Sequence, residues 1–176
     1  MRRSLAKLLL LLVSAATLVQ ETFADGEVTV LTRLKEVYPE WSPNAALDVG
    51  ANVGAWTVRA RRMYPDTKIL MLEAYNDFAE RLQQKKDQAP NVTDFQIAVL
   101  SARDGETVDF YQKGNTGNSM FKQIGAKSAY ENVEPVQKVT STLDTVKKNS
   151  FLKDERVDYI KLDVQGKENK HKRVVA

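Results

Sequence analysis

The chain has 176 residues, of which 43% are apolar, and a formal net charge of +3, so it is long enough to bury the core of one domain. Acidic and basic residues are interspersed along most of it, which argues against a nucleic-acid-binding surface. The absence of cysteine and the single histidine exclude disulfides and cysteine metal centres, and no metal site is expected.

The first 24 residues have the pattern of a secretory signal peptide. A basic start precedes a mostly apolar run at residues 8–19, which is shorter than the ~20 residues needed to span a bilayer. Thr22 and Ala24 are small residues at the positions that a signal peptidase reads. We expect cleavage after Ala24, a secretory or secreted protein, and no stable transmembrane span. An uncleaved signal anchor is the alternative.

Helices and strands are predicted to alternate after the signal. Apolar residues at helical spacing predict a helix over 28–37, which with Pro39 and Pro43 makes an N-terminal helical segment, 25–43. The next predicted elements are a strand over 45–49, a helix over 54–64, a strand over 68–73, a helix over 76–88 capped by Asn76 or Asp77, and a strand over 95–100. Continuous apolar strands alternating with helices are typical of a parallel sheet covered on both faces.

The second half predicts further strands and one helix. In chain order they are a strand over 107–112, a strand over 136–139, a helix over 142–148 that begins at a capping threonine, and a strand over 157–163. Between the first two lies a polar, glycine-rich loop, residues 114–125. Such loops often carry a lid or bind substrate.

A glycine-rich turn follows the first predicted strand. Gly50 and Gly54 remove side chains where a ligand and the backbone must approach each other, and Asn52 tolerates a left-handed backbone. Asp48, at the end of the strand, can accept hydrogen bonds from an ammonium or from turn amides. A strand, a glycine turn and a helix in this order are typical of nucleotide-like ligand sites in α/β domains.

Glu73 completes the pattern, because it ends the second strand 23 residues after Gly50. Dinucleotide folds place a ribose-binding acid ~20 residues along, so the pair predicts an adenosine-bearing ligand. The turn reads G-A-N-V-G, with Asn52 where the pyrophosphate fingerprint has its middle glycine, so a side chain would crowd a pyrophosphate. A tight turn beside a surface glutamate is the plain structural alternative.

Four segments resemble the FkbM-type S-adenosylmethionine-dependent methyltransferase family. They are ALDVGANVGAWT, LEAYNDF, IAVLSARDG and VDYIKLDVQG, within residues 44–166. The resemblance implies a Rossmann-like class I methyltransferase fold, a mostly parallel sheet with helices on both faces. Two departures stand out. Gln165 replaces the family's usual glutamate, and the chain continues as a charged tail, 167–176, where the family has further elements. The last strands of a seven-stranded sheet are therefore expected to be missing.

The resemblance also implies the site. S-adenosylmethionine would lie over the turn, with Glu73 on its ribose, Asp48 near its methionine end, and Asp163 facing the methyl group and the acceptor. The remaining residues implied in cofactor binding are Gly50, Ala51, Asn52, Gly54 and Ala98, with Ile97 beside Ala98 near the adenine. The pair Asn118 and Ser119 would line the pocket.

Asp163 has two interpretations, a base that takes the acceptor's proton or a structural carboxylate that caps the next segment. Lys161 lies two residues earlier on the same strand face and is expected to pair with it.

The sequence leaves three alternative functions to be tested. The first is methylation of a hydroxyl oxygen on a sugar or small natural product, with a small-molecule or carbohydrate acceptor as the partner. The second is an inactive or binding-only secreted remnant of such a domain. The third is a nicotinamide-dependent oxidoreductase fragment, against which the interrupted fingerprint counts.

Overall fold

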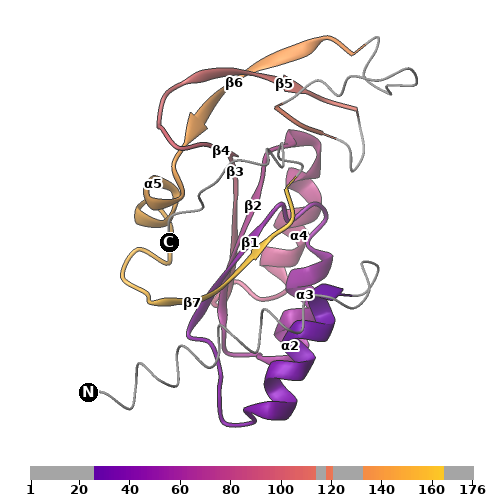
Figure 1. Ribbon diagram of the computed structural model, residues 1–176, viewed down its shortest axis with the longest axis vertical. Helices are drawn as coiled ribbons and strands as arrows, with labels where there is room; N and C mark the ends of the chain where they lie inside the picture. Colours follow the sequence, from indigo (N-terminus) through magenta and orange to yellow (C-terminus); the bar gives the residue numbers. More distant parts are fainter. Residues whose placement is uncertain (1–25, 114–117, 121–132, 165–176) are drawn as a thin grey trace.

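A computed structural model describes residues 26–113, 118–120 and 133–164 of the chain. Its centre is a four-stranded parallel sheet in the order β3-β2-β1-β7 (Figure 1). The strands are β1 (Ala45–Val49), β2 (Lys68–Glu73), β3 (Thr93–Ile97) and β7 (Val157–Leu162). The predicted α/β fold with a parallel sheet is confirmed.

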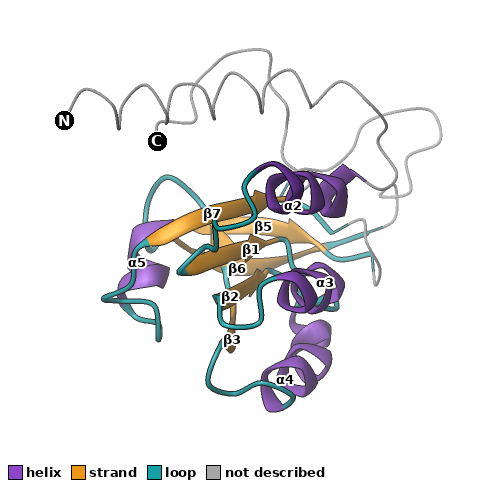
Figure 2. Ribbon diagram, turned by 90° about the horizontal axis from the view of Figure 1, so that it is seen from below, coloured by secondary structure: helices purple, strands orange, loops and turns teal. Residues whose placement is uncertain are grey.

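Helices cover both faces of this sheet (Figure 2). One face carries α2 (Gly26–Val37), α3 (Ala55–Met63) and α4 (Ala79–Asp87), and the other carries α5 (Leu143–Lys148). All five residues of β1 are buried, because alternate side chains enter opposite halves of the core. This two-sided burial explains the continuous apolar run in the sequence.

The core has a separate hydrophobic cluster on each side of β1. On the α5 side, Leu47 and Val49 pack with Val146 and with Leu152, which is 0% exposed. The cluster on the opposite side consists of Ala46, Ile69, Leu31, Trp56, Ala60 and Tyr64. Burying one large aliphatic side chain stabilises the fold by ~1.5–3 kcal/mol, so these clusters hold the helices against the sheet.

A second, smaller sheet lies beyond the carboxyl ends of the parallel strands (Figure 1). It has the order β4-β6-β5 and is built from β4 (Val99–Leu100), β5 (Thr107–Tyr111) and β6 (Pro135–Ser141). The strand predicted over 95–100 is therefore divided at Ala98. The residues before it pair with β2, whereas Val99 and Leu100 pair with β6.

The helix predicted over 76–88 begins differently from the expectation. A short 3-10 turn, η1 (Asn76–Phe78), precedes α4, and neither Asn76 nor Asp77 caps it. Both side chains are engaged elsewhere, because Asn76 accepts a hydrogen bond from Lys138 and Asp77 accepts one from the Tyr75 hydroxyl. The predicted cap of α5 is confirmed, since the hydroxyl of Thr142 accepts from the amide three residues later.

Several expectations lie outside the described residues. These are the signal segment 1–24, most of the loop 114–125, Gln165, and the tail 167–176 with its histidine. Within the described ranges, no helix combines the length and the apolar character that a membrane span requires.

Candidate functional site

The turn between β1 and α3 has the backbone that its sequence predicts. Gly50 (φ +74°), Asn52 (φ +52°) and Gly54 (φ +76°) all adopt left-handed conformations. A Cβ on Gly50 would lie 2.0 Å from the Asp163 carbonyl oxygen, and one on Gly54 would lie 2.9 Å from Cγ of Lys85. The close approach that excludes side chains here is therefore made by the chain itself, by the end of β7 and by α4.

The backbone amides of this turn donate to acceptors within the protein. Gly50 and Ala51 both donate to the Leu72 carbonyl, at 2.9 and 3.0 Å. Asn52 donates to Oε2 of Glu73 at 2.8 Å, and Gly54 donates to the Ala51 carbonyl at 2.8 Å. A pyrophosphate-binding turn directs such amides at the ligand instead. This turn is therefore braced from within and is not arranged as a phosphate cradle.

Glu73 ends β2 and holds the turn from the side. Its Oε1 accepts from the amides of Ala74 and Tyr75, each at 2.9 Å, and its Oε2 accepts from Asn52. A carboxylate has about four acceptor positions, so one remains on Oε2 of this half-buried side chain. Glu73 can therefore accept one further hydrogen bond, as from a ribose hydroxyl.

Asp48 is turned into the protein and is 0% exposed. It accepts from the Thr57 hydroxyl at 2.7 Å, and its Oδ1 lies 3.2 Å from Nζ of Lys161. Burial raises the pKa of Asp48 above its ordinary value, against the opposing effects of the Lys161 charge and the Thr57 hydrogen bond. Asp48 thus supports the turn indirectly, because the Lys161 ammonium that it contacts also donates to the Gly50 carbonyl.

Asp163 is positioned beside the turn by the end of β7. Its amide donates to the Val49 carbonyl at 3.0 Å, and its side chain is 70% exposed. The expected pair with Lys161 is confirmed, at 3.6 Å between Nζ and Oδ2, and the same ammonium donates to the Gly50 carbonyl at 2.9 Å. One buried cation therefore joins the turn and both aspartates.

The remaining predicted residues lie on two different parts of the fold. Ala98 donates its amide to the Glu73 carbonyl at 2.8 Å, so it lies beside the predicted ribose acid, with Ile97 before it on β3. Ser119 pairs instead with Tyr111 of β5, in the second sheet, and the carboxamide oxygen of Asn118 accepts from the Lys113 amide.

Lys138 was not predicted from the sequence, yet it reaches the same edge from β6. Its Nζ donates to the Ala74 carbonyl and lies 2.7 Å from Oδ1 of Asn76, with the Phe110 ring centroid 4.8 Å away. Burial lowers the pKa of Lys138, and the carboxylates of Glu73 and Asp77 oppose this effect. No local motif marks a lysine inside a short strand, so its role depends on how the second sheet is placed.

The site is thus a set of carboxylates and ammonium groups at the carboxyl edge of the parallel sheet. In the part of the chain that the structure describes, no three histidine, aspartate or glutamate side chains gather as a metal site would require. The arrangement can hold a hydroxyl-bearing ligand at Glu73 and can accept a proton at Asp163.

Three solved structures show partial similarity to this chain. Coclaurine N-methyltransferase, bound to N-methylheliamine and SAH, is 15% identical, with a TM-score of 0.36 over 48% of this chain and 25% of that one. Precorrin-6y C5,15-methyltransferase from Geobacter metallireducens is 15% identical, with a TM-score of 0.34 over 44% and 40% of the two chains. The [4+2]-cyclase SpnF is 15% identical, with a TM-score of 0.33 over 49% and 33%. The chain thus covers well under two thirds of each structure, and no curated protein matches it.

The family model described as the methyltransferase FkbM domain matches residues 48–170, which is more than half of the chain. The match begins at Asp48 and includes the glycine turn, Glu73, Ala98 and Asp163. It confirms the resemblance that the four segments carry. The chain belongs to the FkbM methyltransferase domain family.

Proposed function

We propose that the protein binds S-adenosylmethionine and methylates a hydroxyl oxygen of a sugar or small natural product. The observation that carries this proposal is the difference in hydrogen-bonding capacity between the turn amides and Glu73 at the edge of the sheet. The turn amides of Gly50, Ala51, Asn52 and Gly54 donate within the protein, whereas Glu73 keeps one acceptor position beside them. This fits a ligand whose ribose needs an acceptor and whose other end carries no phosphate. S-adenosylmethionine is such a ligand, and it supplies an electrophilic methyl group on a sulfonium.

The chain's own residues then have separate roles. Glu73 accepts a ribose hydroxyl and fixes the ligand along the edge of the sheet. Asp163, exposed and next to Gly50, takes the proton from the acceptor hydroxyl. Lys161 positions Asp163 relative to the turn, because its ammonium contacts the Asp163 carboxylate and the Gly50 carbonyl. Alignment of this kind supplies much of the rate in a displacement reaction.

A binding-only protein is the second candidate, and the surroundings of Asp163 favour it. The Asp163 side chain is 70% exposed, so the described residues leave this part of the site open to water. Catalytic sites gain from excluding water, because their electrostatic interactions are then stronger. A nicotinamide-dependent oxidoreductase is less well supported, since four of the turn amides that could hold a pyrophosphate already donate within the protein.

The first experiment measures ligand binding by calorimetry and thermal melting. S-adenosylhomocysteine is expected to raise the melting temperature, whereas NAD is not. Glu73→Gln should weaken S-adenosylhomocysteine binding at least tenfold, and Glu80→Gln, an exposed acid on α4, should not. A shift with NAD alone, or equal affinity in both variants, would refute the cofactor assignment.

The second experiment separates catalysis from binding. Transfer of a labelled methyl group to a panel of sugars and hydroxylated small molecules is expected for the unaltered protein. Asp163→Asn should keep the affinity for S-adenosylhomocysteine and lose turnover. Binding without transfer to any acceptor would favour the binding-only role.

We also propose that the protein acts in the secretory pathway, on the basis of its N-terminal signal pattern. After expression in a secreting host, the mature amino terminus should be Asp25. An intact Met1 on a membrane-bound product would indicate a signal anchor instead.

A further inference from the structure

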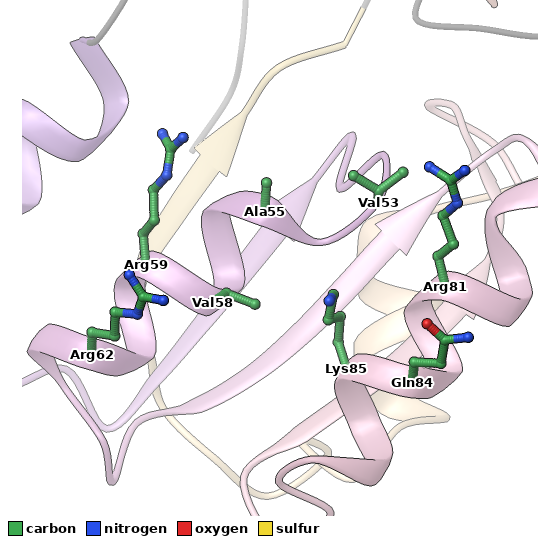
Figure 3. Close-up of a pocket in the computed structure, with 8 residues that line it drawn as sticks. All are labelled: Val53, Ala55, Val58, Arg59, Arg62, Arg81, Gln84 and Lys85. Carbon is green, nitrogen blue, oxygen red and sulfur yellow. The ribbon is translucent and has the colours of Figure 1, made fainter.

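A basic hollow lies between α3 and α4, on the helical side of the molecule (Figure 3). We call it the α3–α4 groove. Its volume is about 420 Å³, which is within the range of small-molecule sites. Its apolar part is formed by Val53, Ala55 and Val58, and its polar part comes from both helices: Arg59 and Arg62 from α3, and Arg81, Gln84 and Lys85 from α4.

The charge of this groove is of one sign. Four of the lining side chains are cationic and none is acidic. Among the described residues, no carboxylate forms an ion pair with any of the four. Neighbouring helices that gather like charges without a counter-charge lose stability through repulsion. An anion bound between them would remove that cost.

The cations are placed for binding from both sides. Each helix contributes two of them, and Figure 3 shows the side chains rising around the three apolar residues between the helices. Lys85 is held in place, because its stem packs against Gly54, where a Cβ would approach its Cγ to 2.9 Å. A side chain that is already ordered loses less entropy when it binds a ligand.

We propose that the α3–α4 groove binds a small ligand that carries at least two phosphate or sulfate oxyanions. Guanidinium groups present a planar set of donors that matches such oxyanions, and two are available on α3 alone. The cations surround a hollow instead of extending as a stripe, so a compact ligand fits better than a nucleic acid or a membrane surface. The four cations lie on α3 and α4 and none of them is a residue of the proposed cofactor site, so this inference does not depend on the proposed methyl transfer.

The test uses the full chain and inorganic pyrophosphate, measured by isothermal titration calorimetry at constant ionic strength. A sulfated disaccharide forms the second arm and distinguishes the source of the oxyanions. The groove variant Arg62→Gln with Arg81→Gln removes one cation from each helix, and both side chains are exposed. The matched control, Lys148→Gln with Lys153→Gln, removes the same charge from two exposed positions, one at the end of α5 and one in the turn after it.

Saturable binding of either probe that weakens at least tenfold in the groove variant, and less than twofold in the control, is expected. Equal losses in the two variants, or no saturable binding, would overturn the proposal. Binding only to DNA or to anionic vesicles would overturn it as well, in favour of a macromolecular surface. If the double variant does not fold, each single substitution should still raise the dissociation constant several-fold. Unchanged S-adenosylhomocysteine affinity in the groove variant would show that the α3–α4 groove and the cofactor site bind their ligands independently, so that each proposal is tested separately.

Discussion

Replacing Gly50 by alanine should destabilise the protein more than the same replacement at Gly105, the other turn glycine compared below. The left-handed backbone at φ +74° costs a non-glycine residue ~1–2 kcal/mol. The new Cβ would also lie 2.0 Å from the Asp163 carbonyl oxygen, so the end of β7 must move outward by more than 1 Å to reach an ordinary contact of ~3.5 Å. That movement breaks the 3.0 Å hydrogen bond from the Asp163 amide to Val49, which contributes ~1 kcal/mol. Together these two costs give an expected loss of ~2–3 kcal/mol.

Gly105→Ala is the matched control, since Gly105 has nearly the same backbone, φ +77°, and no atom within 4 Å of its added Cβ. It should lose only the backbone cost of ~1–2 kcal/mol. Urea denaturation followed by circular dichroism gives both free energies of unfolding, and equal slopes in urea would show that the unfolded states are comparable. Equal losses for the two variants would refute the reasoning, because the end of β7 would then not be seated against the turn.

Two further predictions concern stability away from the site. Hydrogen bonds, first from the Thr142 amide, lower the pKa of Asp104 below its ordinary value, so its ionised form stabilises the fold above pH ~4 and this contribution disappears as the pH falls through the lowered pKa. Asp104→Asn should therefore make the free energy of unfolding less dependent on pH between 5 and 2 in acid titrations of urea melts, and an unchanged slope would contradict this. Leu152→Ala should cost ~2–5 kcal/mol, because the side chain is 0% exposed in the α5-side cluster. Val139→Ala, at 64% exposure, should change stability by less than ~0.5 kcal/mol, and similar losses for both would show that α5 does not cover a core.

The sequence predicts most accurately those elements whose signals are local. The predicted strands 45–49 and 68–73 match β1 and β2 at both ends, because each is buried on both faces and bounded by turn residues. Thr142 was identified as a cap for the same reason, since capping depends on a hydroxyl and the amides next to it. The second sheet could not be predicted, because its β4 has two residues and pairs with a strand some forty positions later.

The sequence predicts some residues of the candidate site but not the contacts between them. Spacing along the chain identified Glu73, since the end of a strand fixes which edge of the sheet an acid occupies. Spacing could not show that Asp48 faces Lys161, because that pair depends on β7 lying beside β1 in the observed register. Nor could it place Lys138, whose contact with the Ala74 carbonyl depends on the position of the whole second sheet. Alternation within a strand shows which face of the sheet a side chain lies on, but it does not show which distant element that side chain will contact.

The internal bracing of the turn has a consequence for how its ligand is selected. The amides of Gly50, Ala51 and Asn52 are already paired with Leu72 and Glu73, so the turn need not become ordered when a ligand binds. Binding to a preorganised surface loses little conformational entropy, but here the backbone also contributes few hydrogen bonds of its own. Selectivity must then reside in the few side-chain groups that still have capacity, above all the last acceptor position of Glu73. Glu73→Gln should therefore lower both the ligand affinity and the stability of the turn, because the amide nitrogen that replaces one carboxylate oxygen cannot accept hydrogen bonds from the ligand or from the backbone amides that Glu73 now holds.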